Sequence, residues 1–154
     1  MELLKLPPRI KVLEALSAVC GGRVNVISDK FCRVISSDGT RTYNVYVDVE
    51  KRIAYSDDNG TRFRRYVGYP IIAFLMTKKI LPIDGEIGKL IRDVRWRELK
   101  ERYRKYELVM NDVLKMLRIY GIDRERVEGY INDVLRTLRE LRLRYSDKLP
   151  PQPF

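Results

Sequence analysis

The sequence contains no histidine among its 154 residues. Imidazole is the side chain that most often moves protons near neutral pH and the commonest metal ligand, so sites that require histidine are excluded. The pair Gly21-Gly22 is not followed by the lysine and serine or threonine of a phosphate-binding loop. We therefore expect a non-enzymatic protein without a cofactor or a bound metal.

Cysteine is scarce, and the two residues present are Cys20 and Cys32. Their spacing is not that of a CxxC motif, so neither a metal site nor thiol catalysis is predicted. In a reducing cytosol two free thiols are expected. A thermophilic source, with which the composition is compatible, would favour a disulfide between them.

Long hydrophobic runs are also lacking. No apolar stretch approaches the length of about 18 to 20 residues that a membrane span needs. The opening segment, residues 1–6, has neither the basic region nor the long apolar stretch and cleavage site of a signal peptide. We expect a cytoplasmic protein that does not contact a membrane.

Basic residues outnumber acidic ones. The chain has 31 Lys+Arg against 21 Asp+Glu, which gives a formal net charge of +10. Such a charge indicates an acidic partner, and nucleic acid is the commonest one, because each neutralised phosphate releases condensed counterions. An acidic protein surface is the alternative partner.

The pattern of hydrophobic residues predicts an α+β fold. The expected order is a helix over 9–19, strands over 23–27, 31–36, 42–49 and 52–56, a turn at 57–60, a further strand over 61–66 and a short buried helix over 71–76. The first four strands, separated by turn signals, predict an antiparallel meander. Val45 and Val47 alternate with Tyr46 and Asp48, so one face of the sheet is expected to be buried.

Beyond residue 86 the hydrophobic residues recur every three or four positions, which predicts helices. A short helix over 86–94 is followed by one apolar stripe over 96–120, which predicts a helix of about 25 residues. Gly121 ends this helix and Asp123 caps a last one that runs to residue 148. The two long helices are expected to form an antiparallel αα-hairpin of about 35 Å.

A change in composition near residue 84 divides the chain. We expect a helix-plus-sheet module over 1–83, a helical hairpin over 84–148 and a Pro-rich tail over 149–154. The hairpin has more apolar surface than so small a module is expected to cover, which favours a homodimer or a complex subunit. A monomer is expected instead if Ile87, Ile91, Trp96 and Leu99 cover the sheet module.

The best candidate for phosphate contact is the basic segment after the turn. As a strand, it would place Arg62, Arg64 and Tyr66 on one face, with guanidinium groups for phosphate and a ring for stacking. The neighbouring cations of this group are Arg41, Arg52 and Arg65. The alternative is a solvated sheet edge, whose positive charge opposes aggregation.

A second basic group lies on the long predicted helix. Its candidate phosphate contacts are Arg95, Arg97, Lys100 and Arg104. Acidic residues spaced four positions before basic ones in this segment are also typical of a merely solvated helix face, which is the alternative interpretation. The last helix carries further arginines at 136, 139, 142 and 144, to which the same alternative applies.

Three carboxylates form the only nuclease-like group that the sequence offers. Asp48, Asp57 and Asp58 could imitate a Mg²⁺ site, because hard cations take carboxylate oxygens. The alternative is that Asp57-Asp58-Asn59-Gly60 is simply a turn, for which these residue types are sufficient.

Two segments resemble a known family. The run YNVYVDVEKRIAYS at 43–56 and the run YVGYPIIAFLM at 66–76 resemble the SWIM domain, a small zinc-binding module with a β-hairpin and a helix. Ala54 and Ser56 stand where that family has its CxC pair, and Gly68 and Pro70 stand where it has its Cys and His. The resemblance implies a metal-free relative with a DNA-associated or protein-docking role. The order of a small β-rich module and a helical hairpin also resembles GINS-type replication subunits.

These observations favour a non-enzymatic nucleic-acid-associated protein, with DNA favoured over RNA and with repair or replication as its setting. The competing hypothesis is an adaptor subunit that docks a protein partner through its C-terminal helical hairpin. A metal-dependent nuclease is the third and least favoured hypothesis.

Overall fold

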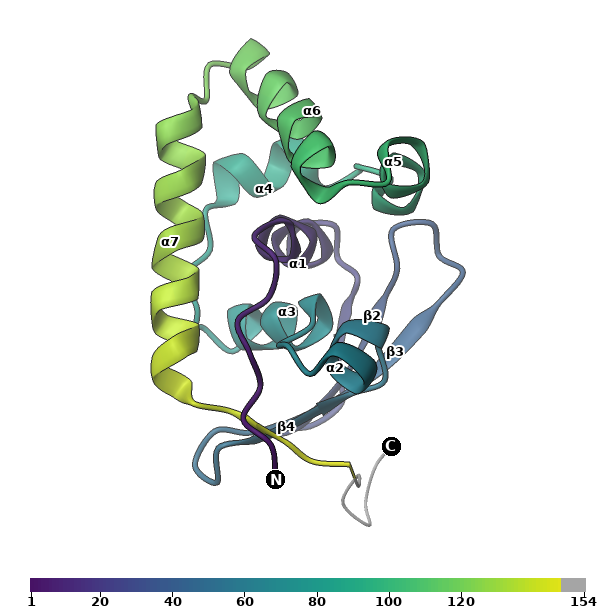
Figure 1. Cartoon of the computed structure of the whole chain (residues 1–154), viewed down its shortest axis with the longest axis vertical. Helices are drawn as coiled ribbons and strands as arrows, with labels where there is room; N and C mark the ends of the chain where they lie inside the picture. Colours follow the sequence, from purple (N-terminus) through teal and green to yellow (C-terminus); the bar gives the residue numbers. More distant parts are fainter. Residues whose placement is uncertain (148–154) are drawn as a thin grey trace.

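The computed structural model describes residues 1–147 and has the predicted α+β class (Figure 1). Its elements in chain order are α1 (Ile10–Cys20), β1 (Val24–Val26), β2 (Phe31–Ile35), β3 (Thr42–Asp48), β4 (Ile53–Ser56), α2 (Asn59–Arg64), α3 (Tyr69–Thr77), α4 (Gly85–Ile91), α5 (Trp96–Tyr103), α6 (Tyr106–Ile119), α7 (Arg124–Leu141) and β5 (Arg144–Tyr145). The predicted Pro-rich tail, residues 149–154, lies outside the described residues.

The five strands form one sheet in the order β1-β2-β3-β4-β5. The first four are antiparallel neighbours, so the predicted meander is confirmed. The fifth strand was not predicted. Helix α7 ends at Arg142, which has the left-handed φ of 49°, and the chain then runs parallel to β4, with Ile53 opposite Arg144.

The central strand β3 buries more than one face. Val45 and Val47 are buried against the helices, as alternation predicts. Tyr46 on the opposite face is buried too, because its ring packs on Phe31 of the neighbouring strand with the centroids 5.0 Å apart. Cross-strand aromatic pairs of this kind stabilise a sheet.

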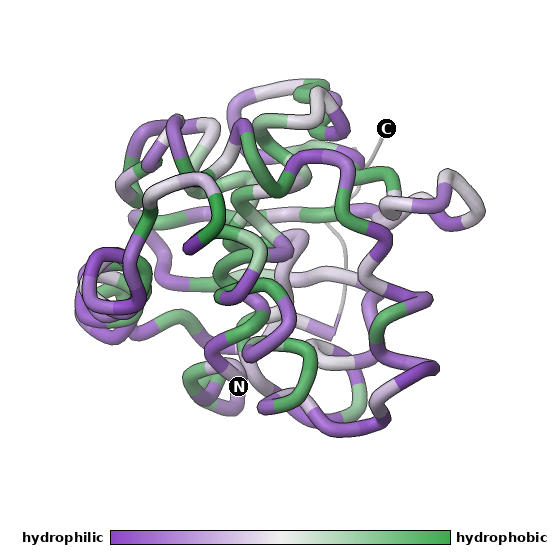
Figure 2. The backbone as a smooth tube through the Cα atoms, turned by 90° about the horizontal axis from the view of Figure 1, so that it is seen from above, coloured by the Kyte–Doolittle hydropathy of each residue, from purple (hydrophilic) through white to green (hydrophobic). Residues whose placement is uncertain are grey.

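Helices α1 and α3 form the centre of the molecule. Every side chain from Ile10 to Ala18 of α1 and from Pro70 to Met76 of α3 is buried, as expected for helices surrounded on all sides. The other helices and the sheet are arranged around them, and hydrophobic segments gather toward the middle of the trace (Figures 1 and 2). One continuous core therefore includes side chains from both sides of residue 84.

The predicted strand over 61–66 is wrong, because residues 59–64 form the helix α2. Asp58 caps this helix: its Oδ2 accepts from the Thr61 backbone N–H at 3.1 Å and its Oδ1 from the Thr61 hydroxyl at 2.8 Å. The same hydroxyl accepts from the backbone N–H of Gly68 at 3.0 Å. The turn signal Asp-Asp-Asn-Gly is thus a helix start, since turn residues and N-cap residues are the same types.

The predicted helix over 96–120 is divided. Arg104 has a left-handed φ of 60° and ends α5, and Lys105 is extended before α6 begins. Apolar periodicity does not reveal this break, because it continues in phase across it. Helices α6 and α7 are joined by a short turn as expected, but they diverge from that turn rather than lying along each other (Figure 1).

Most of the apolar stripes of these C-terminal helices is covered by the chain itself, while Tyr106 and Tyr120 at the two ends of the α6 stripe are exposed. Ile87, Ile91 and Trp96 are buried and Leu99 is half-buried. Helix α7 is seen almost along its axis in Figure 2 and turns its hydrophobic side toward the rest of the molecule. The expected exposure of these apolar side chains was the reason to favour a dimer or a complex, and the chain itself buries most of them. The oligomeric state stays a prediction.

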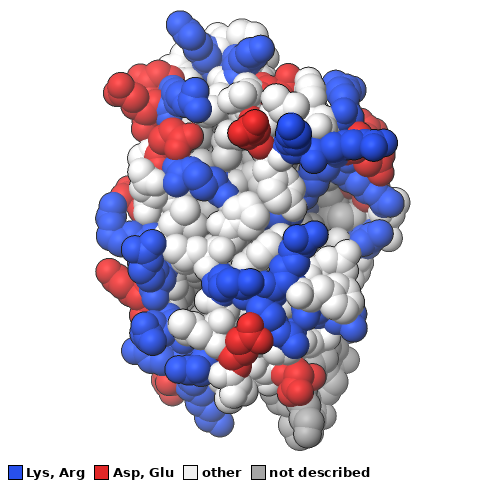
Figure 3. Space-filling model, viewed as in Figure 1, with Lys and Arg blue, Asp and Glu red and all other residues white. Residues whose placement is uncertain are grey.

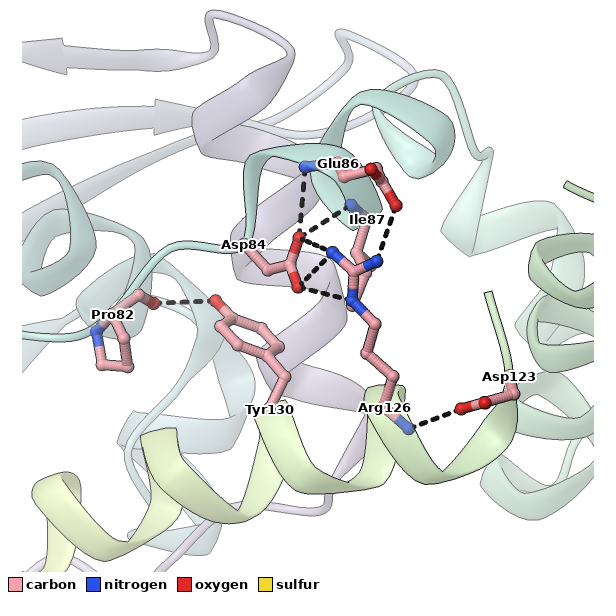
Figure 4. A network of polar contacts seen from close by, with 7 residues as sticks. All are labelled: Pro82, Asp84, Glu86, Ile87, Asp123, Arg126 and Tyr130. Carbon is pink, nitrogen blue, oxygen red and sulfur yellow. Dashed lines mark hydrogen bonds and ion pairs between the residues drawn. The ribbon is translucent and has the colours of Figure 1, made fainter. Parts of the chain in front are cut away.

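Helix α7 is held to the segment before α4 by a polar network (Figure 4). The Arg126 guanidinium donates to both carboxylate oxygens of Asp84 at 3.0 Å and to Glu86 at 2.6 Å. The Tyr130 hydroxyl donates to the Pro82 carbonyl at 2.8 Å. Asp84 also caps α4 by accepting from backbone N–H groups. The network fixes the position of α7 and hence that of its C-terminal end.

Replacing Asp58 by Ala should lower the free energy of unfolding by about 2 kcal/mol, because the change removes an N-cap and leaves the buried Thr61 hydroxyl without its acceptor. Urea-induced unfolding followed by circular dichroism measures this. Asp93→Ala is the matched control, since Asp93 is exposed and should change stability by less than about 0.5 kcal/mol. Equal effects of the two substitutions would contradict the capping role.

Candidate nucleic-acid interface

Three segments that are far apart in the sequence lie side by side at one end of the molecule. The N-terminal segment pairs on one side with the end of α2, where the Lys5 N–H donates to the Arg65 carbonyl at 2.8 Å and the Val67 N–H donates to the Lys5 carbonyl at 3.0 Å. On its other side the Leu4 N–H donates to the Leu143 carbonyl at 2.9 Å. Backbone pairing thus fixes α2, the N-terminal segment and the end of α7 as neighbours.

These three segments carry a concentration of positive charge. We call the group the basic junction; its members are Lys5, Arg62, Arg64, Arg65, Arg139, Arg142 and Arg144. All except the half-buried Arg65 are exposed. Within residues 1–147 the sole ion pair of this group joins Arg65 to Glu2 at 3.5 Å. The other six cations have no acidic partner in this part of the chain, and among them Arg144 donates to the Met1 carbonyl at 3.1 Å.

The junction lies on the face shown in Figure 3. Lys and Arg side chains dominate the lower half of this face, over α2, the N-terminal segment and the end of α7, and acidic side chains are few there. Clustered charges of one sign attract an oppositely charged polymer and raise its association rate. Lys5, Arg139 and Arg142 also line a pocket of about 200 Å³.

A large aromatic ring stands among these cations. Phe63 on α2 is 71% exposed, and the Arg62 guanidinium lies 5.1 Å from its ring centroid. Aromatic rings beside arginines form the stacking platforms on which proteins hold unpaired bases.

Arg65 and Tyr66, both predicted as contacts, are used mainly by the fold. The Arg65 guanidinium lies 3.7 Å from the Tyr145 ring centroid and donates to the Arg62 carbonyl at 2.6 Å. Tyr66 is buried, so the prediction that it stacks on a base is wrong. Burial raises the pKa of Tyr66 to about 12, although the nearby Lys11 ammonium opposes that shift.

Arg52 is also a structural residue rather than a free phosphate contact. Its guanidinium donates to the backbone carbonyls of Glu140 at 3.3 Å and Leu141 at 2.9 Å, at the C-terminus of α7. The last carbonyls of a helix have no partner within the helix, so this arginine satisfies them. Arg41, predicted as its neighbour, instead lines a cavity near α5 together with Arg97.

The predicted basic face of the long helix is dispersed. Arg95 pairs with Glu98 at 3.6 Å, and Arg97 pairs with Asp38 at 3.5 Å. Lys100 forms an ion pair with the buried Glu14. Arg104 terminates α5 in the left-handed conformation. These four cations are positioned by separate local partners and turns, so they do not form a continuous track for a phosphate backbone.

The three nuclease-like carboxylates each serve a local hydrogen bond. Asp48 accepts from the Lys51 N–H at 3.1 Å and pairs with Lys30, Asp57 accepts from the Asn44 N–H at 2.9 Å, and Asp58 caps α2. In the described part of the chain, no group of three or more His, Cys, Asp or Glu side chains could hold a metal ion.

The two cysteines do not form a disulfide. Cys20 and Cys32 are free thiols, and burial raises the pKa of Cys32 to about 12. A protonated thiol is a poor nucleophile and a poor metal ligand.

Within residues 1–147, none of the helices is both long and apolar enough to cross a membrane.

A family model described as "Uncharacterised conserved protein UCP014422" matches residues 4–144. The chain belongs to this family. All three segments of the basic junction lie within the matched range, from Lys5 to Arg144. No curated protein and no solved structure matches the chain. The resemblances to SWIM domains and GINS-type subunits stay predictions.

Replacing Arg52 by Ala should lower the free energy of unfolding by about 1 kcal/mol, because the carbonyls at the end of α7 lose their donor. Lys51→Ala is the control, since Lys51 is the exposed neighbour and should change stability by less than about 0.5 kcal/mol. Chemical denaturation measures both. If Arg52→Ala weakened nucleic-acid binding and left stability unchanged, the assignment of Arg52 to the fold would be wrong.

Proposed function

We propose that this protein binds nucleic acid through the basic junction, with unpaired bases stacked on Phe63 and phosphates held by the surrounding arginines. The proposal depends on one observation: six exposed cations that have no acidic partner among residues 1–147 lie on segments that neighbour an exposed aromatic ring. The proposed partner is single-stranded nucleic acid, with DNA favoured over RNA.

Two physical arguments support this partner. Guanidinium groups donate hydrogen bonds in a planar fork that matches phosphate oxygens, and all but one of the cations in the junction are arginines. A ring that projects from the surface can be reached by a splayed base but not by a base inside a duplex. The junction thus has both of the contacts that single strands use, backbone charge and base stacking.

The competing adaptor function has less support. It depends on an apolar face of the C-terminal helices that remains open to a partner. Val113 and Leu117 of α6 and Val127, Ile131 and Val134 of α7 are instead buried in the core. No charge argument identifies a particular protein partner, so nucleic acid is the better-supported proposal.

The charge contribution is tested by the triple substitution Arg62→Ala, Arg64→Ala and Arg139→Ala. Log affinity for single-stranded DNA should fall linearly with log salt, and the triple variant should reduce the magnitude of that slope by about 2, since each lost phosphate contact removes about 0.7. Fluorescence anisotropy of a labelled oligonucleotide, titrated at several salt concentrations, measures both slopes.

A charge-matched variant separates a local site from a general effect of net charge. Lys89→Ala, Lys115→Ala and Arg118→Ala also removes three exposed cations, but from α4 and α6, far from the junction (Figure 1). This control should leave the slope nearly unchanged. Equal losses in both variants, or no binding by the native protein even at low salt, would refute the proposed interface.

The stacking contribution is tested at Phe63. Phe63→Ala should weaken binding to single-stranded DNA about tenfold, because base stacking on a ring contributes about 1 to 3 kcal/mol, and should change duplex binding less than about twofold. Phe63→Trp should retain the affinity, while Ile119→Ala, another exposed apolar residue, is the neutral control. Equal weakening of single-strand and duplex binding by Phe63→Ala would exclude stacking.

A further inference from the structure

A second polar site lies between helix α5, helix α1 and the β2–β3 hairpin, formed by elements other than those of the basic junction. It is a cavity of about 170 Å³. Its polar lining includes Glu14, Asp38, Arg41, Arg97 and Lys100, and its aromatic lining is Tyr43, Tyr69 and Trp96. A cavity of this volume is comparable to the engineered apolar cavities that hold a benzene ring.

The floor of this cavity is a carboxylate shared by two ammonium groups. Glu14 is only 3% exposed. One of its oxygens pairs with Lys100, and the other lies 3.0 Å from Lys11 Nζ. One carboxylate carries one negative charge, so this group of Glu14 and two ammonium ions has a net positive charge. Burial lowers the pKa of Lys100 to about 8 and the Lys11 charge lowers it further, while Glu14 opposes that shift.

The second acid of the lining, Asp38, is paired with Arg97, which also pairs with Glu101 at 3.4 Å. Asp38 accepts from the hydroxyls of Ser36 and Thr40 at 2.8 and 2.7 Å and pairs with Arg97 at 3.5 Å. These hydrogen bonds hold the pKa of Asp38 well below its usual range. Arg41 is exposed and has no acidic partner among residues 1–147. In and around the cavity the four cations Lys11, Arg41, Arg97 and Lys100 therefore outnumber the three carboxylates Glu14, Asp38 and Glu101, which leaves an excess of positive charge.

The walls select for a flat ligand. Tyr43 and Tyr69 pack edge to face with their ring centroids 5.9 Å apart, and the buried Trp96 is fixed by the hydrogen bond from its Nε1 to the Ser17 hydroxyl at 3.1 Å. Fixed aromatic walls bind a planar unsaturated body without a further cost of ordering side chains.

We propose that this cavity is a binding site for a small aromatic carboxylate, whose carboxylate lies between Lys100 and Arg41 and whose ring contacts Tyr43, Tyr69 and Trp96. The proposal is independent of nucleic-acid binding at the basic junction, because the two sites share no residue. A ligand of this class would place its negative charge at the excess positive charge of the cavity and its ring against the aromatic walls.

Trp96 allows a direct test, because it is the only tryptophan of the chain and lines the cavity. Benzoate should change its fluorescence saturably, with a dissociation constant of about 1 mM or tighter. Benzylamine, which has the same ring and the opposite charge, should not bind. Sodium chloride at equal ionic strength is the blank. Saturation by benzylamine, no saturation by benzoate, or equal binding of inorganic phosphate would each overturn the proposal.

The site is located by substitution at an exposed residue, so that folding is not at risk. Arg41→Gln should weaken benzoate binding about tenfold, as expected for the loss of a hydrogen bond between charged groups. Arg95→Gln removes an equally exposed arginine next to α5 that does not line the cavity, and it should leave the affinity unchanged. Equal effects of the two substitutions would place benzoate elsewhere and refute the site.

The pH dependence provides a readout specific to Lys100. Affinity for benzoate should fall as the pH rises through about 8, because the Lys100 ammonium then loses its proton. The other charged or titratable groups around it are Lys11, Glu14, Arg23, Asp38, Arg41, Tyr43, Tyr69, Arg97 and Glu101. Burial raises the pKa values of the two tyrosines and hydrogen bonds lower the pKa of Asp38, so in this range the tyrosines stay neutral and Asp38 stays ionised.

The variant Lys100→Met should bind benzoate more weakly than the native protein at pH 7 and should show no change in affinity between pH 7 and 9. Its Trp96 fluorescence in the absence of ligand and its unfolding curve report whether it is folded. A folded variant that keeps the native pH dependence would overturn the assignment of Lys100, and with it the proposed position of the carboxylate.

Discussion

Helix α1 is surrounded by protein on every side, and this complete burial determines much of the remaining structure. A buried polar group is costly unless it has a partner, so each polar residue of α1 has to be met by a neighbouring element. Glu14 is met by Lys11 and Lys100, and Ser17 donates to the Ile91 carbonyl and accepts from Trp96. These contacts draw the end of α4 and the start of α5 against α1, and α5 then forms one wall of the polar cavity.

The two ends of the described chain meet on the opposite side of the core. Leu4 is buried between α2 and the segment after α7 because backbone hydrogen bonds hold it from both sides. The same pairing adds β5 to the edge of β4. Cations that are separated by more than a hundred residues in the sequence are thereby placed on one surface. These cations lie close together because backbone hydrogen bonds pair their three segments near the sheet edge. Part of the net positive charge of the chain is therefore concentrated on one surface.

The arginines of this protein divide into two groups according to what they contact. Arg52, Arg65 and Arg126 satisfy backbone carbonyls, aromatic rings or carboxylates of the fold. Arg62 and Arg64 have no acidic partner among residues 1–147 and extend from a short helix beside Phe63. A large positive charge is therefore not evidence that each cation binds a ligand. The unpaired members identify the surface on which a phosphate polymer would be held.

The sequence by itself determined the α+β class, the first four strands and their antiparallel order, the buried helix α3 and the helical character of the C-terminal half, because these depend on local periodicity and turn residues. It also indicated the basic segment at 62–65. Only the tertiary structure decided that this segment is a helix capped by Asp58, that Arg104 breaks the long helix, that residues 144–145 form a strand and that Tyr66 is buried. Three of these depend on contacts that the hydrophobic pattern does not encode: Thr61 is fixed by Gly68, β5 requires the edge of β4, and Tyr66 requires Lys5 and Lys11 beside it. The junction and the cavity depend on the same kind of long-range contact, which hydrophobic periodicity does not encode.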